Sequence, residues 1–267
     1  GNTFRDTQWR LDGNTNYDSM FNNTPLQRLS LSSLQEFRVL TNNFNAEHGS
    51  TSTGLVITTT KSGTDDFHGE VFFFGRPSGI QSRPPLANIR VPNQLLQEGA
   101  ALGGPMVRNR VYFFANYERV RQDRGSFVQA PWNDFVVGNF KDNLALAKFD
   151  FRFSDSHWIS ARANGHRDSN NNANDNVGGL KQPSGATFTK GQTVAGQVTD
   201  TKIWRELVNE FRAGYTNALP SNTYPLVPQV AISRPGYSAE GGSSYSTART
   251  EVYQIADQIS WQHQNHT

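Results

Sequence analysis

The chain of 267 residues contains no cysteine. This absence excludes disulfide bonds, thiolate metal centres and cysteine nucleophiles within it. It also lacks any apolar run approaching the about 20 residues that a transmembrane helix needs. The longest apolar runs, such as Val111–Ala115, have the length of a strand. The sequence motifs of nucleotide-binding loops, serine hydrolases and zinc proteases are missing as well, so none of these enzyme classes is indicated.

Blocks of charge of one sign are also missing. Lys and Arg total 25, Asp and Glu total 23, and the formal net charge is +2. Without a basic patch, no nucleic-acid partner is predicted. The six histidines are scattered, and the one close pair, His263 and His266, does not point both rings at one ion from a strand. We therefore predict no metal site and no cofactor.

Aromatic residues are plentiful at 12%, although the apolar fraction is only 35%. A soluble α/β enzyme of this length is usually more apolar, so the composition indicates a β-rich chain with one polar face. Alternation is clearest at 147–153, where alanine and phenylalanines occupy one face and Lys148, Asp150 and Arg152 the other. A soluble β-sandwich buries its apolar face, whereas a membrane barrel turns that face toward lipid.

Three features of the later chain favour the barrel over the sandwich. Its segments have about the 9–11 residues that cross a bilayer as a strand. Short turns at 108–110 and 154–156 alternate with long polar loops at 79–92, 168–186 and 218–247. Aromatic residues lie near strand ends, where interfacial girdles form, at Tyr117, Trp158, Trp204, Tyr215 and Trp261. The predicted strands are Asp66–Pro77, Gln94–Val107, Arg110–Asp123, Asn143–Phe153, His157–Arg167, Thr187–Trp204, Leu207–Asn217 and Glu251–His263.

The first 62 residues follow a different pattern of shorter elements. Glu36–Leu40 and Gly54–Thr60 are rich in β-branched and apolar residues and predict two short strands. An Asp12–Gly13 pair predicts a tight turn. Leu29–Phe37 has helical spacing, so we expect one or two helical turns capped by Ser33. A small mixed α/β unit is therefore predicted.

Three blocks of this sequence, at 36–49 (EFRVLTNNFNAEHG), 60–74 (TKSGTDDFHGEVFFF) and 98–121 (EGAALGGPMVRNRVYFFANYERVR), occur in an order and spacing typical of one family. The chain resembles the junction of plug and barrel in TonB-dependent outer-membrane receptors, and most of all their Oar-like branch. Members of that branch usually carry a carboxypeptidase-regulatory-like domain upstream. The resemblance implies a mainly β fold: an antiparallel transmembrane β-barrel, partial and open here, preceded by part of a small α/β plug. Residues 1–62 would be the end of the plug, 63–66 the linker and 67–267 the first part of the barrel.

The resemblance also implies a function in the outer membrane of a Gram-negative bacterium. Such receptors bind a bulky nutrient at the cell surface and import it by plug movement, with energy delivered by TonB. The partners implied are outer-membrane lipid, an unknown nutrient ligand and TonB, bound through a TonB box expected upstream of Gly1. The alternatives are a structural or adhesive barrel without uptake, and a soluble β-rich enzyme acting on carbohydrate. The candidate lumen-facing polar residues are Glu70, Arg76, Glu118, Lys148, Arg152 and Arg162.

The number of strands leads to a further expectation. About 200 residues follow the junction, enough for about eight or nine membrane strands with their loops. Plugged barrels of this kind have about 22 strands. We therefore expect this chain to be part of a larger protein, with a curved but open sheet and Asp66–Pro77 along one free edge.

Overall fold

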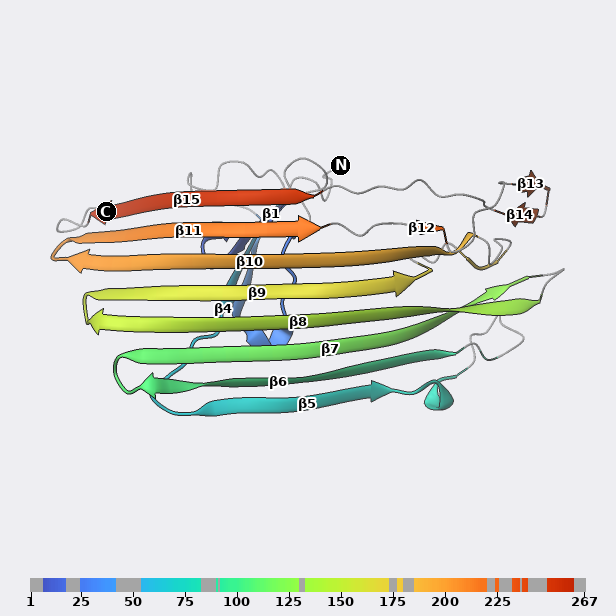
Figure 1. Ribbon diagram of the computed structural model, residues 1–267, viewed down its shortest axis with the longest axis horizontal. Coiled ribbons are helices and arrows are strands. Elements are labelled where there is room, and N and C mark those ends of the chain that lie inside the picture. The colour runs from blue at the N-terminus through green and yellow to red at the C-terminus, as the bar shows by residue number, and fades with distance from the viewer. Residues whose placement is uncertain are drawn as a thin grey trace.

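A computed structural model gives the arrangement of the chain, which, besides a separate short two-stranded sheet, folds into two main sheets of different size (Figure 1). The smaller one, formed by β1 to β4, is called the inner sheet below. The larger one, formed by β5 to β11 and β15, is called the wall. The structure describes residues 7–17, 25–41, 54–82, 90, 92–129, 133–172, 177–179, 185–219, 224–225, 232–235, 237–239 and 249–261.

The inner sheet has the strand order β2-β1-β4-β3. Strands β3 (Leu34–Leu40) and β4 (Gly54–Thr60) pair antiparallel, which confirms both predicted strands. On the other side of β4, β1 (Thr7–Leu11) runs parallel to it and then turns back into β2 (Asn14–Thr15). The predicted turn between β1 and β2 is confirmed, with positive φ angles of 46° at Asp12 and 83° at Gly13. Glycine tolerates this left-handed backbone best, and aspartate better than most residues.

The helical segment is shorter than predicted. A single 3-10 turn, η2 (Leu31–Ser33), precedes β3, and the described residues contain no α-helix. The predicted cap at Ser33 is wrong, because the side chain of Ser30 caps the turn by accepting a hydrogen bond from the Ser32 N–H. Ser33 is instead fully buried and donates its hydroxyl to the Ser30 carbonyl at 2.6 Å. The chain has already become extended at Leu34, which leaves no room for a second turn.

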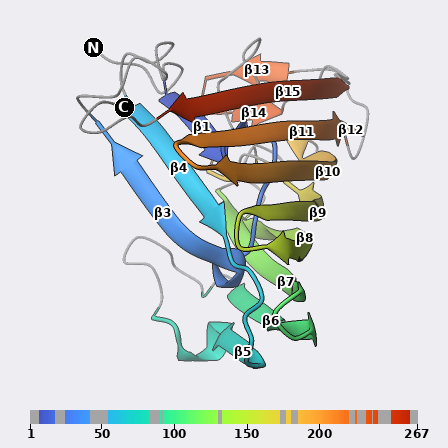
Figure 2. The same cartoon turned by 90° about the vertical axis from the view of Figure 1, so that its left-hand side faces the viewer.

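The wall is an antiparallel sheet in which neighbours in the chain are neighbours in space, in the order β15-β11-β10-β9-β8-β7-β6-β5. Figure 2 shows it as an arc, with the inner sheet in its hollow. The fold class expected from the sequence, an open antiparallel barrel sheet, is confirmed. As expected, β5 lies along one free edge. The strands are β5 (His68–Arg76), β6 (Asn93–Val107), β7 (Val111–Val128), β8 (Asp134–Ser154), β9 (His157–Asn171), β10 (Thr187–Trp204), β11 (Leu207–Leu219) and β15 (Thr250–Trp261).

Several wall strands run further than predicted at the end away from the short turns. The pairing of β7 with β8 continues to Val128 and Asp134, although the predicted strands stop at Asp123 and begin at Asn143. The extension is stabilised by a separate apolar cluster of Val128, Val177 and Ala186. β9 likewise includes residues 168–171, which the sequence predicted as loop. These segments lie beyond the apolar band of the wall. They contain glycines and polar residues, so their sequence lacks the alternation of apolar and polar residues that predicts a strand.

The connections also separate into two kinds. Tight turns join β6 to β7 and β8 to β9, as predicted, with Asn109 at a φ of 60°, and a third tight turn joins β10 to β11. At the opposite end lie η4 (Ser78–Ile80), β12 (Tyr224–Pro225), β13 (Ile232–Arg234) and β14 (Tyr237–Ala239). Most of the remaining predicted loop residues, and both histidines of the pair 263 and 266, lie outside the described residues.

The two faces of the wall differ in exposure. One face, called the inner face, carries buried side chains at alternate positions of each strand, such as Arg162, Asn164 and His166 of β9. The other, called the outer face, exposes large apolar side chains such as Phe149 and Val198. One predicted girdle residue is placed wrongly. Trp158 pairs with buried Thr201 of β10 and therefore belongs to the inner face.

Candidate functional site

The candidate site is the contact between the inner sheet and the inner face of the wall. Strand alternation decides which wall residues reach it, since every second side chain points to the same face. The strands contribute long polar side chains there, and the inner sheet contributes turns and strand ends. Figure 2 shows the crossing of the two sheets, with β4 running across the hollow side of β8 to β10.

The centre of the contact is the turn at Asp12. Its carboxylate accepts hydrogen bonds from the N–H and the hydroxyl of Thr60, both at 2.8 Å. Oδ2 of the same carboxylate lies 3.2 Å from Nε of Arg162, whose side chain is only 3% exposed. One acidic group thus fastens β1 to β4 and both of them to β9.

Two further wall residues complete this group around Arg162. Gln197 of β10 accepts a hydrogen bond from Arg162 Nη2 at 3.0 Å, and its own Nε2 donates to the Asp12 carbonyl at 2.7 Å. Lys148 of β8 donates from Nζ to the carbonyl and hydroxyl oxygens of Thr60, at 3.4 and 3.3 Å. Arg162 is therefore paired with an opposite charge, and Lys148 is hydrogen-bonded to neutral oxygens, which are conditions under which a protein tolerates buried charge.

A second group of contacts surrounds the 3-10 turn. The Ser30 hydroxyl donates to the carboxylate of Glu118, which also accepts from Gln97 at 2.7 Å. Asn116 donates from Nδ2 to the hydroxyl of Ser32 at 2.5 Å. Among the described residues here, Leu29 packs against a buried apolar cluster of Ala101, Phe114 and Leu146.

A third group involves Arg28, whose Nη1 lies 3.2 Å from Asp142 and 3.7 Å from Asp168. Both carboxylates are buried in the wall, while the Arg28 side chain is half exposed. A pocket of about 400 Å³ opens beside this pair, between the inner sheet and β7–β8, and is lined by Trp9, Gln27, Arg28 and Glu118 among others.

The contact continues to the far edge of the wall. Gln27 donates from Nε2 to the hydroxyl of Thr216 in β11 at 2.9 Å. Gln254 of β15 binds the backbone of Thr15 twice, accepting from its N–H at 2.9 Å and donating to its carbonyl at 2.7 Å. This side-chain amide acts as a partner for the free edge of β2, which would otherwise present unpaired backbone groups.

The structure separates the six candidate polar residues into two sets. Glu118, Lys148 and Arg162 are buried and contact the inner sheet as described above. Arg76 and Arg152 are exposed near strand ends, and among the described residues neither side chain is hydrogen-bonded or ion-paired to strands β1–β4. Glu70 is half exposed and lies 3.6 Å from Lys61, in the connection between the two sheets.

Sequence reasoning missed other members of the site. Asp142, Asn116, Gln197, Thr216 and Gln254 all have the inward register of their strands. Asp142 was missed because the strand was predicted to begin one residue later. The signal that finds the others is the same alternation that identified Lys148, applied to uncharged polar residues as well as to charged ones.

Some buried polar atoms of the interface have no hydrogen-bond partner in either sheet. Within the described part of the chain, Nη1 of Arg162 and both amide atoms of Asn164 are buried without a protein partner. Buried polar groups are normally hydrogen-bonded, and bridging water serves where protein does not. Bridging water would satisfy these atoms at low cost.

The described residues contain no group of three or more histidine, cysteine or carboxylate side chains that would hold a metal ion. No described helix is long and apolar enough to cross a membrane. The arrangement instead resembles a small domain held inside a larger curved sheet.

Comparison with known proteins agrees with this geometry. Residues 59–146 match the family model described as an outer membrane beta barrel domain. The crystal structure of the outer membrane transporter YddB from Escherichia coli superposes with a TM-score of 0.69, at 11% identity, over 96% of this chain and 38% of that one. Residues 59–146 are therefore similar to an outer membrane beta barrel domain, and the fold of the chain is that of the outer-membrane transporter on which it superposes.

Two further relatives show how far the similarity extends. Over 127 residues the chain is 31% identical to the TonB-dependent transporter Oar of Myxococcus xanthus, which covers 44% of this chain and 12% of Oar. The siderophore receptor PirA of Acinetobacter baumannii superposes with a TM-score of 0.60 at 14% identity, over 94% of this chain and 37% of that one. The chain thus spans about an eighth of the Oar transporter and under two fifths of the solved structures. These relatives are transporters and receptors.

Proposed function

We propose that this chain is the plug-to-barrel part of a TonB-dependent receptor, which binds a bulky nutrient at the cell surface and imports it into the periplasm. In this proposal residues 1–62 are the end of the plug, 63–66 the linker and 67–267 the first part of the barrel. The chain has no enzymatic role of its own. The similarity to Oar and to a siderophore receptor supports this class of function.

The observation that carries the proposal is the polar character of the contact between the inner sheet and the wall. Asp12, Arg28 and Gln27 bind the wall through ion pairs and hydrogen bonds, and Leu29 provides the apolar packing. A buried ion pair contributes little net free energy, because its attraction mainly offsets the desolvation of the two charges. A dry apolar contact, in contrast, would lose about 25 cal/mol for every Å² exposed.

Such a contact suits a domain that must leave its place and return. When the inner sheet moves, water solvates Asp12 and Arg162, so the free energy of separation stays small. The contacts still define one docked position, because each polar group has a specific partner. Import through the barrel requires this combination of defined position and easy release.

The alternative is a structural or adhesive barrel in which the inner sheet stays in place. To separate the two, Gln27, which is 7% exposed, is replaced by cysteine in the full-length protein. Because this chain has no cysteine, the new thiol is the only one in it. Living cells then receive a membrane-impermeant maleimide from outside.

If the chain belongs to a receptor with a moving plug, we expect the Gln27→Cys variant to be labelled in energised cells that contain TonB. Labelling should be strongly reduced in cells that lack TonB or are treated with an uncoupler. Equal labelling with and without TonB contradicts energised plug movement and favours the structural alternative. A second variant, Ser32→Cys with Asn116→Cys, joins positions whose side chains are already hydrogen-bonded. Its disulfide should abolish receptor-dependent uptake, and reduction should restore it.

A further inference from the structure

The connection that leads from the inner sheet into β5 is bound to the wall. Asp65 accepts two hydrogen bonds with Oδ1, one from the Tyr112 hydroxyl at 3.0 Å and one from the Asn109 N–H at 3.2 Å. Both donors belong to the hairpin of β6 and β7. Asn109 lies in its tight turn, and Tyr112 is a buried residue at the start of β7. The carboxylate of Asp65 therefore fixes the connection to one hairpin of the wall.

Gly63 lies against the backbone of the same hairpin. A Cβ built at this position would lie 2.7 Å from the carbonyl oxygen of Gly104 and 2.8 Å from the backbone nitrogen of Phe113. Gly104 and Phe113 are paired residues of β6 and β7, so their backbone atoms cannot move aside without opening the ladder. A residue without a side chain is therefore required where the connection approaches the wall so closely.

The two residues after the connection pack on glycines of β6 in a similar way. A Cβ built at Gly103 would lie 2.7 Å from Nε2 of His68, and one at Gly104 would lie 2.8 Å from Cε1 of Phe67. The Phe67 ring also contacts the ring of Phe113, with 6.4 Å between the ring centroids. We call the five wall residues that hold this segment the linker slot: Gly103, Gly104, Asn109, Tyr112 and Phe113.

The inner sheet ends immediately before the linker slot. Lys61 donates its N–H to the Ser33 carbonyl at 2.9 Å, and Thr60 is bound to Asp12 as described above. In the part of the chain that the structure describes, no hydrogen bond involves Ser62. A single residue therefore separates the last residue bound to the inner sheet from the first residue bound in the slot.

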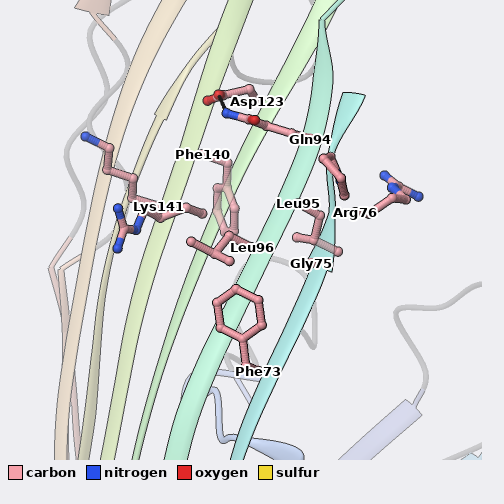
Figure 3. A pocket seen from close by; sticks show the side chains of 11 residues that line it. Phe73, Gly75, Arg76, Gln94, Leu95, Leu96, Asp123, Phe140 and Lys141 are labelled. Atoms are coloured by element: carbon pink, nitrogen blue, oxygen red, sulfur yellow. Dashed lines mark hydrogen bonds between the residues drawn. The ribbon is translucent and has the colours of Figure 1, made fainter. Parts of the chain in front are cut away.

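The other end of β5 has a looser environment. It borders an open pocket of about 460 Å³, whose lining includes Phe73, Gly75 and Leu96. Figure 3 shows Phe73 and Leu96 in the middle of this pocket, with Gly75 and Arg76 to one side. A Cβ built at Gly75 would have its nearest contact at 3.4 Å, with the Phe73 ring, which is an ordinary van der Waals distance. Gly75 thus lacks the close backbone contacts of Gly63.

The position of the slot limits how the inner sheet can leave the wall. An extended chain spans about 3.3–3.6 Å per residue, so Lys61 stays within about 7 Å of Gly63 while the slot holds the connection. The opposite side of the inner sheet contacts β15 through Thr15 and Gln254. β15 and β5 are the two edges of the wall. Rotation about Ser62 therefore separates the contacts at β15 most and those near β7 least.

We propose that Ser62 is the pivot of the inner sheet and that Asp65 is a positioning residue, which keeps residues 63–66 in the linker slot while the sheet moves. This inference rests on the movement proposed above and adds which part of the connection stays behind. Since the pivot keeps its place, every polar group of the sheet returns to its own partner, such as Asp12 to Arg162.

The test measures distances between pairs of spin labels on the full-length protein in detergent. One pair, Ser62→Cys with Asp155→Cys, joins the pivot to the exposed turn between β8 and β9. The second pair, Val39→Cys with Asp155→Cys, joins the exposed far end of β3 to the same turn. Urea is added until the inner sheet is released but the barrel keeps its heat-modifiable migration. The Val39 distance should then become long and broadly distributed, whereas the Ser62 distance should stay narrow.

Variants of the slot should abolish this difference. Gly63→Ala should expel the connection, so that the Ser62 distance also broadens under the same conditions. Residues 63–66 add about 14 Å to the reach of the sheet when they are free. Asp65→Ala combined with Tyr112→Phe should broaden the Ser62 distance less, because the glycine contacts remain. Gly75→Ala is the matched control on β5 and should leave the Ser62 distance unchanged.

Three results would overturn the proposal. If both distances broaden together with the slot intact, the connection leaves the wall with the inner sheet. If the Ser62 distance stays narrow in both slot variants, the slot does not hold the pivot. If the Val39 distance persists until the barrel unfolds, the sheet has no separate movement and no pivot. These distances are measured without TonB or transport, so the labelling of Gln27→Cys tests the proposed function separately.

Discussion

The two faces of the wall are built from the same strands but meet different surroundings. On β8 and β9 the inner face buries Lys148, Arg162 and Asp142, whereas the outer face exposes Phe149 and Phe153. A water-soluble sheet has the opposite distribution, with its apolar side chains packed in the core and its charges in water. The comparison shows that the wall takes lipid as the solvent of one face and a polar domain as the partner of the other.

The wall strands and the inner sheet also differ in how firmly they are held in place. Wall strands are joined by continuous backbone ladders, such as the eighteen residue pairs from Val111–Phe151 to Val128–Asp134 between β7 and β8. The inner sheet is joined to the wall by separate side-chain contacts at Asp12, Ser30 and Arg28. Backbone ladders in lipid cannot be opened without leaving unsatisfied groups, whereas side-chain contacts exchange readily with water.

The largest effect is expected from breaking, at Asp12, the contact between the inner sheet and the inner face of the wall. Asp12→Ala leaves the guanidinium of Arg162 buried without its acidic partner and should destabilise the docking of the inner sheet by about 3–5 kcal/mol. Limited proteolysis of the full-length protein in detergent should then cleave the inner sheet much faster. The barrel itself should keep its heat-modifiable migration. If the barrel is lost as well, the two parts do not respond separately and the comparison is wrong.

The matching change on the outer face is Phe149→Arg. Phe149 pairs with Phe113 and Ala161 in the middle of the apolar band. Arginine on the lipid face near the bilayer midplane costs about 2–4 kcal/mol, so refolding into lipid vesicles should decline strongly. Arg152→Gln, three residues away and with inward register, is the control and should refold normally. Equal loss in both variants would contradict the assignment of the faces.

A smaller effect is expected at the turn that enters the site. Gly13 has a φ of 83°, and a Cβ built there would lie 1.8 Å from Nη1 of Arg212. Gly13→Ala should cost about 1–2 kcal/mol for the left-handed backbone, and the guanidinium has to move as well. Proteolytic release of the inner sheet should increase less than with Asp12→Ala. An unchanged rate would show that this turn does not position the sheet.

The smallest effect is expected at Glu70. Its contact with Lys61 is 3.6 Å long and both side chains are partly exposed, so solvent screens the pair. Such pairs contribute about 0–1 kcal/mol. Glu70→Gln should leave both proteolysis and heat modifiability as they are. A large effect would mean that the connection between the sheets is part of the docking contact, which it is not in this account.

The sequence predicted the wall well because lipid imposes a simple pattern. Apolar alternation at 147–153 identified the faces of β8, and short turns identified two hairpins, β6 with β7 and β8 with β9. Beyond the apolar band the pattern vanishes, which is why the extension of β7 to Val128 and the inward Asp142 were missed. Trp158 was misassigned because an aromatic residue near a strand end occurs on either face of the wall, so its type alone does not identify the face.

The contacts within the candidate site were beyond prediction for another reason. Asp12 and Arg162 belong to different sheets, and their pairing depends on the angle at which β4 crosses the wall. No local pattern encodes that angle. Composition and alternation identify residues with inward register, but only the docked arrangement shows that Asp12 binds both Thr60 and Arg162. The boundary at residues 63–66 stays a prediction.

The central claim is that the inner sheet leaves the wall as a unit while the wall stays folded. Single-molecule force spectroscopy tests it most directly, by pulling on the segment before β1 of the full-length protein in a lipid bilayer. The account predicts a first rupture at low force that releases only the inner sheet, and a lower force still for Asp12→Ala. A single rupture in which β5 to β11 unfold together with the inner sheet would contradict it.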